Sequence, residues 1–207
     1  MSQAPRILVF TGDGKGKTTA ALGMALRASG HGMKVAIIQF VKADAEVGEV
    51  RALARNSQIE ILQTGLGFLP SPADPRWADH RAAAEAGLRK ATEIFQAARH
   101  EMVILDEACF AVARGLLKEA DLIALLRRAR PDSSRGLPRP REGKLGNPPD
   151  TLPRDSEPAG GDGCVCIVLT GRGATEGLIA LADTVTEMRC VKHALQGGVP
   201  AQRGVEL

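Results

Sequence analysis

The sequence predicts an α/β fold with three layers, in which helices cover both faces of a mainly parallel sheet. Two observations lead to this prediction. Short runs rich in Val, Ile and Leu alternate with longer segments of helical periodicity, and the first run leads through a glycine-rich turn into a helix. A strand, a crossover helix and a second parallel strand form the repeating unit of such folds. The 207 residues are enough for one domain of this kind with a sizeable core.

The predicted strands are continuous apolar runs rather than alternating ones. A strand that is apolar on both faces is covered on both faces, as in a parallel sheet between two layers of helices. We therefore expect every predicted strand to be buried. The predicted strands are Ile7–Thr11, Lys34–Phe40, Ile59–Gln63, Met102–Asp106, Val165–Thr170 and Val185–Met188.

Helical segments are expected between these strands. The first begins at the glycine-rich turn and ends at Gly30, a natural helix stop. The second is long and rich in alanine, and its two histidines, His80 and His100, are expected to face solvent. The third has apolar residues at helical spacing. The predicted helices are Thr18–Ser29, Arg76–His100, Phe110–Arg130 and Gly173–Ala182.

Residues 131–163 depart from this pattern, because they are dense in Pro, Gly, Ser and charged residues and contain almost no apolar ones. Such a composition cannot bury enough surface to offset the entropy of ordering the chain. We therefore expect one domain over residues 1–207, with a disordered insertion at 132–163. A lid or a docking segment is the alternative interpretation.

The composition argues against several classes of protein. The formal net charge of +3, from 27 Lys and Arg against 24 Asp and Glu, gives no argument for nucleic acid or an anionic membrane as a partner. No apolar run has membrane-spanning length, and the stretch MSQAPRILVF lacks the features of a signal peptide. Cys109, Cys164, Cys166 and Cys190 lack the spacing of a metal site and are expected to be buried thiols. These features predict a cytoplasmic protein.

The stretch ILVFTGDGKGKTTAALG has the order of strand, glycine-rich turn and helix that an anion site needs. The glycines allow successive backbone N–H groups to point inward, and the start of the helix adds its positive end. Lys17 would reach the terminal phosphates of a nucleotide, and the Thr18 hydroxyl would bind Mg²⁺. The loop departs from the common G-x-x-x-x-G-K-[ST] pattern, because Thr11 stands at the position of the first glycine. It therefore stays open at this point whether the nucleotide is hydrolysed or used differently.

A second motif, MVILDEA, supports a nucleotide site independently. Its apolar run ends in Asp106 and Glu107, as in a Walker B strand whose carboxylate holds Mg²⁺ directly or through water. In open parallel sheets, ligands bind at the carboxyl ends of the strands, where both motifs fall. Arg172 follows another strand in VLTGR and is either a phosphate clamp or a surface arginine. Together the motifs predict a P-loop NTPase-like nucleotide-binding domain.

Several stretches of the chain together resemble one family. They are TGDGKGKTTAALG, IIQFVK, VILDEA, VLTGRG, LADTVTEM and VKHALQGGVPAQRGVE. Apart from residues 131–163, nearly the whole chain resembles the ATP:corrinoid adenosyltransferases of the P-loop type. Residues 170–206 are the most diagnostic part, since ordinary P-loop NTPases do not share them. The resemblance implies transfer of the 5′-deoxyadenosyl group of ATP to the cobalt of cob(I)alamin or a related corrinoid, with release of triphosphate, in adenosylcobalamin biosynthesis or salvage.

In that family the cobalt(I) centre is itself the nucleophile, so the resemblance implies neither a general base nor an activated side chain. The protein would orient the substrates and neutralise the leaving triphosphate. Mg²⁺, a homodimer and a reduced flavoprotein or flavin as electron donor are further implications. By resemblance, the phosphate-binding residues are Gly12, Asp13, Gly14, Lys15, Gly16, Lys17, Thr18, Thr19 and Arg172, and the Mg²⁺ partners are Thr18, Asp106 and Glu107.

The sequence departs from the family in the residues expected to contact the corrinoid. The family has an aromatic pair in a G-F-T-W-type run after the third strand, and the corresponding run here is GLGFLPSP. Phe68 matches the phenylalanine, but Pro70 stands at the position of the tryptophan. Trp77 either replaces that tryptophan from a different position or is a packing residue at the start of the long helix. The expected corrinoid-binding residues are therefore Phe68 and Trp77.

Two other functions are compatible with the same motifs. A generic P-loop ATPase or small-molecule kinase would form ADP rather than triphosphate. A non-catalytic, ATP-dependent corrinoid carrier would bind ATP and corrinoid without turnover. In that case, replacement of the family's tryptophan by Pro70 would explain the loss of catalysis.

Overall fold

The computed structural model describes residues 4–130 and 164–205, and it confirms the predicted α/β architecture. A six-stranded sheet with the order β3-β2-β4-β5-β1-β6 forms its centre, and every neighbouring pair of strands is parallel. The insertion predicted at 132–163 lies outside the described residues. The strands are β1 (Arg6–Thr11), β2 (Val35–Gln39), β3 (Ile59–Gln63), β4 (Met102–Asp106), β5 (Cys166–Thr170) and β6 (Thr184–Glu187).

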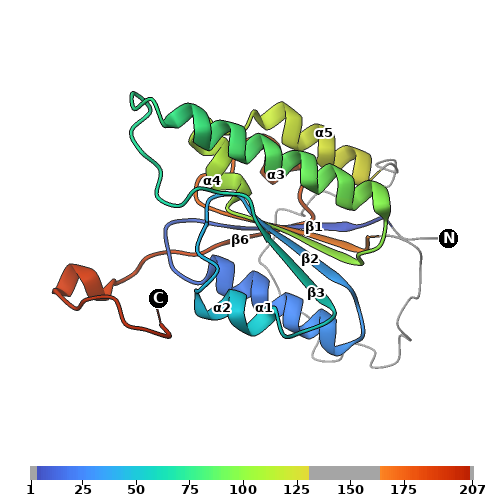
Figure 1. The fold of residues 1–207 in the computed structure, drawn as a ribbon, viewed down its shortest axis with the longest axis horizontal. Coiled ribbons are helices and arrows are strands. Elements are labelled where there is room, and N and C mark those ends of the chain that lie inside the picture. The colour runs from blue at the N-terminus through green and yellow to red at the C-terminus, as the bar shows by residue number, and fades with distance from the viewer. Residues whose placement is uncertain (1–3, 131–163, 206–207) are drawn as a thin grey trace, which may run out of the picture.

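Helices lie on both faces of the sheet (Figure 1). One face carries α1 (Lys17–Gly30) and α2 (Gly48–Leu53), and the opposite face carries the long helix α3 (Trp77–Ala97). In the described part of the chain, no helix is both long and apolar enough to cross a membrane. The other helices are α4 (Ala108–Ala113), α5 (Glu119–Ala129) and α6 (Glu176–Leu181), on the face of α3, and the short 3₁₀ helix η1 (Ala194–Gly197).

Two hydrophobic cores explain the continuous apolar runs of the central strands. In β2, Ala36 and Ile38 belong to the core under α3 and α5, whereas Val35 and Ile37 belong to the core under α1. Successive side chains of a strand point to opposite faces, so a strand between two cores needs apolar residues throughout. All four side chains are completely buried. The prediction of buried strands is therefore confirmed for the centre of the sheet.

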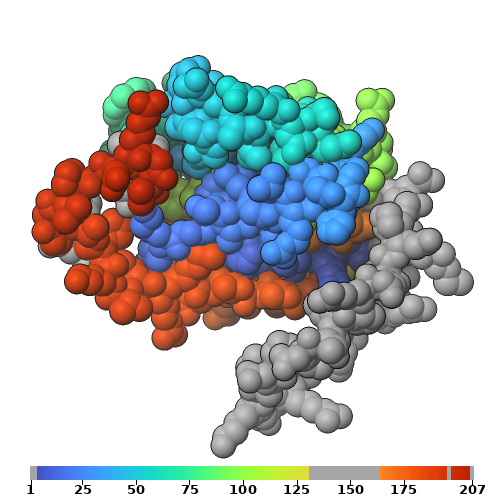
Figure 2. Space-filling model, turned by 90° about the horizontal axis from the view of Figure 1, so that it is seen from below, coloured from blue at the N-terminus to red at the C-terminus, as the bar shows by residue number. Residues whose placement is uncertain are grey.

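The same prediction holds only in part for β3, in which Ile59 alone is buried, and it is wrong for β6. All four of its residues are exposed, because β6 lies at the edge of the sheet and pairs only with β1. Figure 2 shows the segment that contains β6, in orange, on the surface beside α1. Its short run of β-branched residues is typical of any strand, so the sequence pattern did not distinguish an edge strand from a central one.

The helix predicted over Phe110–Arg130 is two helices, α4 and α5. Gly115 follows the end of α4 and has a φ of 73°. The helix ends here because a residue in this left-handed conformation cannot continue it. Leu116 and Leu117 are then buried in the core and direct the chain into α5. α2 is not predicted from the sequence, because its six residues are too few for a clear helical period.

Three side chains contradict the expected burial. His80 is buried, and the side chain of His100 is only 14% exposed, with its Nε2 atom 3.2 Å from Oε2 of Glu60. Both were expected to face solvent, but His80 belongs to the buried side of α3, and His100 lies after α3, beside Glu60 of β3. Cys190 is exposed rather than buried, whereas burial raises the pKa of the Cys109 thiol to about 12.

Candidate active site

The candidate site lies at the carboxyl end of the sheet, where β2, β4, β5 and β1 end side by side. The chain leaves β1 into the glycine-rich loop, β4 ends at Asp106 with Glu107 directly after it, and β5 leads to Arg172. These ends and the C-terminal tail lie at the same end of the molecule (Figure 1). Motifs that are far apart in the sequence therefore meet at one edge, as expected for a parallel sheet.

The glycine-rich loop requires glycine both for its backbone conformation and for space. Gly12 and Gly16 have φ values of 92° and 104°, in the left-handed region that favours glycine. A Cβ atom on Gly14 would lie 2.7 Å from the carbonyl carbon of Arg189. The N–H of Gly14 donates a hydrogen bond to the carbonyl oxygen of Met188 at 2.7 Å. The segment after β6 thus packs directly against the loop and helps to fix its shape.

Lys17 is buried within this loop. Its ammonium donates hydrogen bonds to the carbonyl oxygens of Gly12 at 2.8 Å and Gly14 at 2.6 Å. Burial lowers the pKa of Lys17, and the carboxylate of Glu107 opposes this shift. The loop therefore holds a partly desolvated positive charge, which interacts more strongly with an anion than a solvated lysine does.

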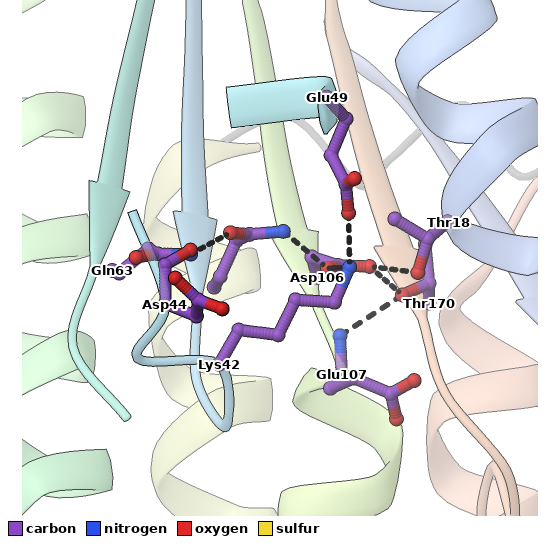
Figure 3. A network of polar contacts seen from close by, with 9 residues as sticks. Thr18, Lys42, Asp44, Glu49, Gln63, Asp106, Glu107 and Thr170 are labelled. Carbon is purple, nitrogen blue, oxygen red and sulfur yellow. Dashed lines mark hydrogen bonds and ion pairs between the residues drawn. The ribbon is translucent and has the colours of Figure 1, made fainter. Parts of the chain in front are cut away.

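Asp106 is completely buried and accepts hydrogen bonds on both carboxylate oxygens (Figure 3). Its Oδ1 atom accepts from the hydroxyl groups of Thr18 at 2.8 Å and Thr170 at 2.7 Å. Its Oδ2 atom accepts from Nε2 of Gln39 at 2.9 Å, and Nζ of Lys42 lies 3.6 Å from it. Because a carboxylate has about four acceptor sites, this one is almost fully used. The Thr18 proton points to Asp106, which turns the lone pairs of the Thr18 oxygen away from that carboxylate.

Glu107 has different surroundings from Asp106. Its φ is 62°, which is uncommon for a residue other than glycine, and its N–H donates a hydrogen bond to the Thr170 hydroxyl at 2.9 Å. Burial and the neighbouring Asp106 carboxylate raise the pKa of Glu107. Figure 3 shows its carboxylate directed away from that of Asp106. Thr170 thus links the carboxylate of Asp106 to the backbone of Glu107.

The remaining predicted phosphate-site residues lie on the outer side of the loop. Nη2 of Arg172 donates a hydrogen bond to the backbone oxygen of Asp13 at 3.4 Å, and Nζ of Lys15 donates one to the backbone oxygen of Val205 at 3.4 Å. Thr19 is exposed on the first turn of α1. The structure therefore brings the predicted phosphate-site residues and both acidic residues together at this edge.

The two aromatic residues expected to contact a corrinoid have unlike environments. Phe68 is fully exposed. It belongs to the loop between β3 and α3, and this loop lies at the same end of the molecule as the C-terminal tail (Figure 1). Trp77 begins α3 and packs, partly buried, against the hydrophobic core. This packing favours the second interpretation of Trp77 and leaves Phe68 as the accessible aromatic side chain of the pair.

A row of polar residues that the motifs do not predict lies next to the two acidic ones. Gln39 is completely buried at the end of β2, and its Oε1 atom accepts a hydrogen bond from Gln63 at 2.9 Å. Gln63 also donates to the backbone oxygen of Asp44 at 3.0 Å, and Lys42 pairs with Glu49 at 3.0 Å. One signal was present in the sequence: in IIQFVK, a glutamine ends a buried apolar run and a lysine follows it.

The edge offers few groups to a metal ion on its own. Within residues 4–130 and 164–205, no three His, Cys, Asp or Glu side chains are arranged to hold one. Mg²⁺ usually binds proteins through one or two oxygen ligands and takes its other ligands from phosphate groups and water. The hydroxyl of Thr18, oriented by Asp106, fits that type of binding.

Comparison with known proteins identifies the family. The family model described as "ATP:corrinoid adenosyltransferase BtuR/CobO/CobP" matches residues 3–135 and 162–207. A corrinoid adenosyltransferase of Pseudomonas aeruginosa is 36% identical over 97% of this chain and 82% of its own length. The corrinoid adenosyltransferase CobA of Salmonella typhimurium and a corrinoid adenosyltransferase of Escherichia coli K12 are each 33% identical over 97% of this chain and 84% of their own length. The chain therefore belongs to the ATP:corrinoid adenosyltransferase family and is an enzyme that transfers the adenosyl group of ATP to a corrinoid.

Proposed function

We propose that this enzyme transfers the 5′-deoxyadenosyl group of ATP to the cobalt of cob(I)alamin or a related reduced corrinoid and releases triphosphate. Family membership supports the two substrates. One structural observation carries the rest: a glycine-rich loop around the buried Lys17 lies beside the hydrogen-bonded pair of Thr18 and Asp106. Such an edge suits a polyphosphate with a bound cation.

In this proposal the glycine-rich loop holds the triphosphate part of ATP. Its backbone N–H groups and the start of α1 provide the partial positive charge that favours an anion at this place. Lys17 adds a full charge inside the loop, and Arg172 adds another at its outer side. The expected binding residues are the stretch from Gly12 to Thr19 and Arg172.

Mg²⁺ fits this edge through the Thr18 hydroxyl, with Asp106 orienting that hydroxyl and Glu107 providing a second carboxylate nearby. The ion would neutralise part of the phosphate charge when bound. Asp106 itself has little free acceptor capacity, so we assign it an orienting role rather than direct contact with the ion. Glu107, whose carboxylate is directed away from Asp106, is the acidic residue that reaches the ion or its water shell.

The chemistry asks little of the protein beyond positioning. A cobalt(I) centre supplies both electrons of the new Co–C bond, and the C5′–O bond breaks with its electron pair leaving on the triphosphate. No proton has to be moved in this step, so the step needs neither a general acid nor a general base. Holding the reacting atoms in line and stabilising the charge on the leaving group are then the main contributions to the rate.

On the corrinoid side, we propose that Phe68 contacts the macrocycle and that Trp77, packed on the core, supports the same loop. Phe68 is an exposed aromatic side chain of the kind that binds large apolar ligands. The loop that carries it and the glycine-rich loop lie at the same end of the molecule (Figure 1).

Family membership alone supports the other parts of the proposal, which are a homodimer, a reduced flavin or flavoprotein as electron donor, and a cytoplasmic location. A single domain interrupted by an insertion is supported by the two matched ranges, 3–135 and 162–207, because the residues between them, 136–161, fall within the segment 132–163.

A product analysis tests this function. The purified protein is incubated without oxygen with ATP, Mg²⁺ and chemically reduced cob(I)alamin, and the corrinoid spectrum is followed while triphosphate and ADP are measured. Light-sensitive adenosylcobalamin with an equal amount of triphosphate is the expected result. ADP without a change in the corrinoid would indicate an ATPase or a kinase instead, and binding of both substrates without any product would indicate a carrier.

A further inference from the structure

Lys42 occupies an unusual position between two carboxylates. Its ammonium lies 3.0 Å from Oε1 of Glu49 and 3.6 Å from Oδ2 of Asp106 (Figure 3). Asp106 is completely buried, whereas the side chains of Lys42 and Glu49 are about one-third exposed, at 31% and 33%. The lysine therefore reaches from the surface to the buried carboxylate, and Glu49 holds it partway.

The contact between Lys42 and Asp106, at 3.6 Å, is the longest of the four that surround this carboxylate. The other three donors, Thr18, Thr170 and Gln39, lie within 2.9 Å of an oxygen of Asp106. A divalent cation bound through Thr18 would carry positive charge close to the same carboxylate as the Lys42 ammonium. Two cations near one carboxylate repel each other and share its charge, so Lys42 opposes binding of the metal.

Glu49 acts in the opposite direction. It belongs to α2 and forms the shorter of the two ion pairs of Lys42. By attracting the ammonium, Glu49 reduces the charge that Lys42 places on Asp106. Without the carboxylate of Glu49, the ammonium would have Asp106 as its remaining acidic partner among the contacts described above.

We propose that Lys42 and Glu49 set how strongly ATP binding depends on a divalent cation, Lys42 weakening this dependence and Glu49 strengthening it. The inference rests on the proposed site for Mg²⁺ and ATP. Both are positioning residues here, since they act through Asp106 and Thr18 and not on the reacting atoms.

The test compares the dissociation constant for ATP in EDTA with that in saturating Mg²⁺, both measured by calorimetry. The dissociation constant in EDTA divided by that in Mg²⁺ gives the energetic coupling between the metal and the nucleotide. Measuring this ratio requires no turnover. The variants are Lys42→Met, Glu49→Gln and the double variant. Matched controls are Lys90→Met and Glu93→Gln, which remove the partners of an exposed ion pair of 2.7 Å on α3. Thermal unfolding confirms that each variant is folded.

We expect Lys42→Met to raise the ratio about fivefold and Glu49→Gln to lower it about fivefold, the scale of one part-exposed charge interaction. The double variant should resemble Lys42→Met, because Glu49 acts only through the lysine. The control variants should leave the ratio unchanged.

Three results would overturn the inference: shifts of the two single variants in the same direction, no shift in either, or a Glu49→Gln effect that persists without Lys42. A loss of ATP affinity in EDTA for Lys42→Met would also overturn it, since the lysine would then bind phosphate directly. Failure of the proposed function would show itself separately, as absence of adenosyl transfer by the unaltered enzyme.

Discussion

At the scale of single residues, Asp106 illustrates how a buried charge can serve a binding site. An isolated carboxylate in the protein interior is very costly, and here three hydrogen-bond donors and a nearby ammonium offset that cost. The same contacts fix the Thr18 hydroxyl and, through Thr170, the backbone of Glu107. Asp106 thus orients the polar groups that surround it in the site.

Part of this site could be predicted residue by residue. Lys17, Thr18 and the two acidic residues belong to local motifs, in which a few neighbouring letters specify the chemistry. Gln39 and Lys42 could not be placed in the same way. Their roles depend on β2 lying next to β4 in the sheet, which the order of strands along the chain does not reveal.

Replacing Thr18 tests the proposed metal contact. Thr18→Val removes the hydroxyl, and we expect the Mg²⁺-dependent gain in ATP affinity to fall about ten- to a hundredfold, as for other disturbed metal sites. Thr18→Ser keeps the hydroxyl and should retain most of the gain. Calorimetric titration with ATP, with Mg²⁺ and with EDTA, measures both. An undiminished Mg²⁺ effect in Thr18→Val would rule out this residue as a ligand.

At the scale of elements, a helix or strand was predicted correctly where its run of residues was long and its apolar side chains were regularly spaced. The residues after the glycine-rich turn and the alanine-rich stretch gave α1 and α3 within a few residues of their observed ends. The apolar spacing of Phe110–Arg130 predicts one helix, because this spacing continues past Gly115 although the backbone changes direction there. The edge position of β6 depends on pairing, which its own residues do not encode.

Two glycines within helices should respond to alanine in opposite ways. Gly23 is exposed in α1, and a Cβ atom there would meet nothing within 4 Å, so Gly23→Ala should raise the free energy of unfolding by about 1 kcal/mol. A Cβ atom on Gly87 of α3 would lie 2.5 Å from Oγ1 of Thr64 and 3.0 Å from Cε1 of Phe40. Gly87→Ala should therefore lower the free energy of unfolding by about 1–3 kcal/mol.

Urea denaturation of both glycine variants and the unaltered protein measures these differences. The two substitutions add the same methyl group to helices of the same fold, so each serves as a control for the other. A stabilised Gly87→Ala variant would mean that α3 does not approach the end of β2 as closely as the structure has it.

At the scale of the whole molecule, the sheet order brings the function together. β4, β5 and β1 are consecutive, so the acidic pair, Arg172 and the glycine-rich loop arrive at one edge from widely separated parts of the chain. The three-layer architecture could be predicted because alternation of strands and helices permits few other arrangements. The sheet order itself could not, because sequence patterns do not say which parallel strands become neighbours.

Removal of residues 136–161, which the family model does not match, tests whether the domain needs them. We expect the shortened enzyme to keep adenosyl transfer and to unfold at the same or a slightly higher temperature, because a shorter connection costs up to about 1 kcal/mol less to close. A second variant with Gly and Ser residues over the same stretch keeps the length and serves as the control. Lost transfer with unchanged thermal stability in both would instead support a lid.

A single-turnover assay of the unaltered enzyme beside Lys17→Ala tests whether the glycine-rich loop serves adenosyl transfer. ATP, Mg²⁺ and cob(I)alamin are mixed without oxygen, and adenosylcobalamin and triphosphate are measured in the same samples. We expect equal amounts of both products from the unaltered enzyme and neither from Lys17→Ala, which should also have lost ATP binding. Transfer by Lys17→Ala at the unaltered rate, or ADP in place of triphosphate, would contradict this expectation.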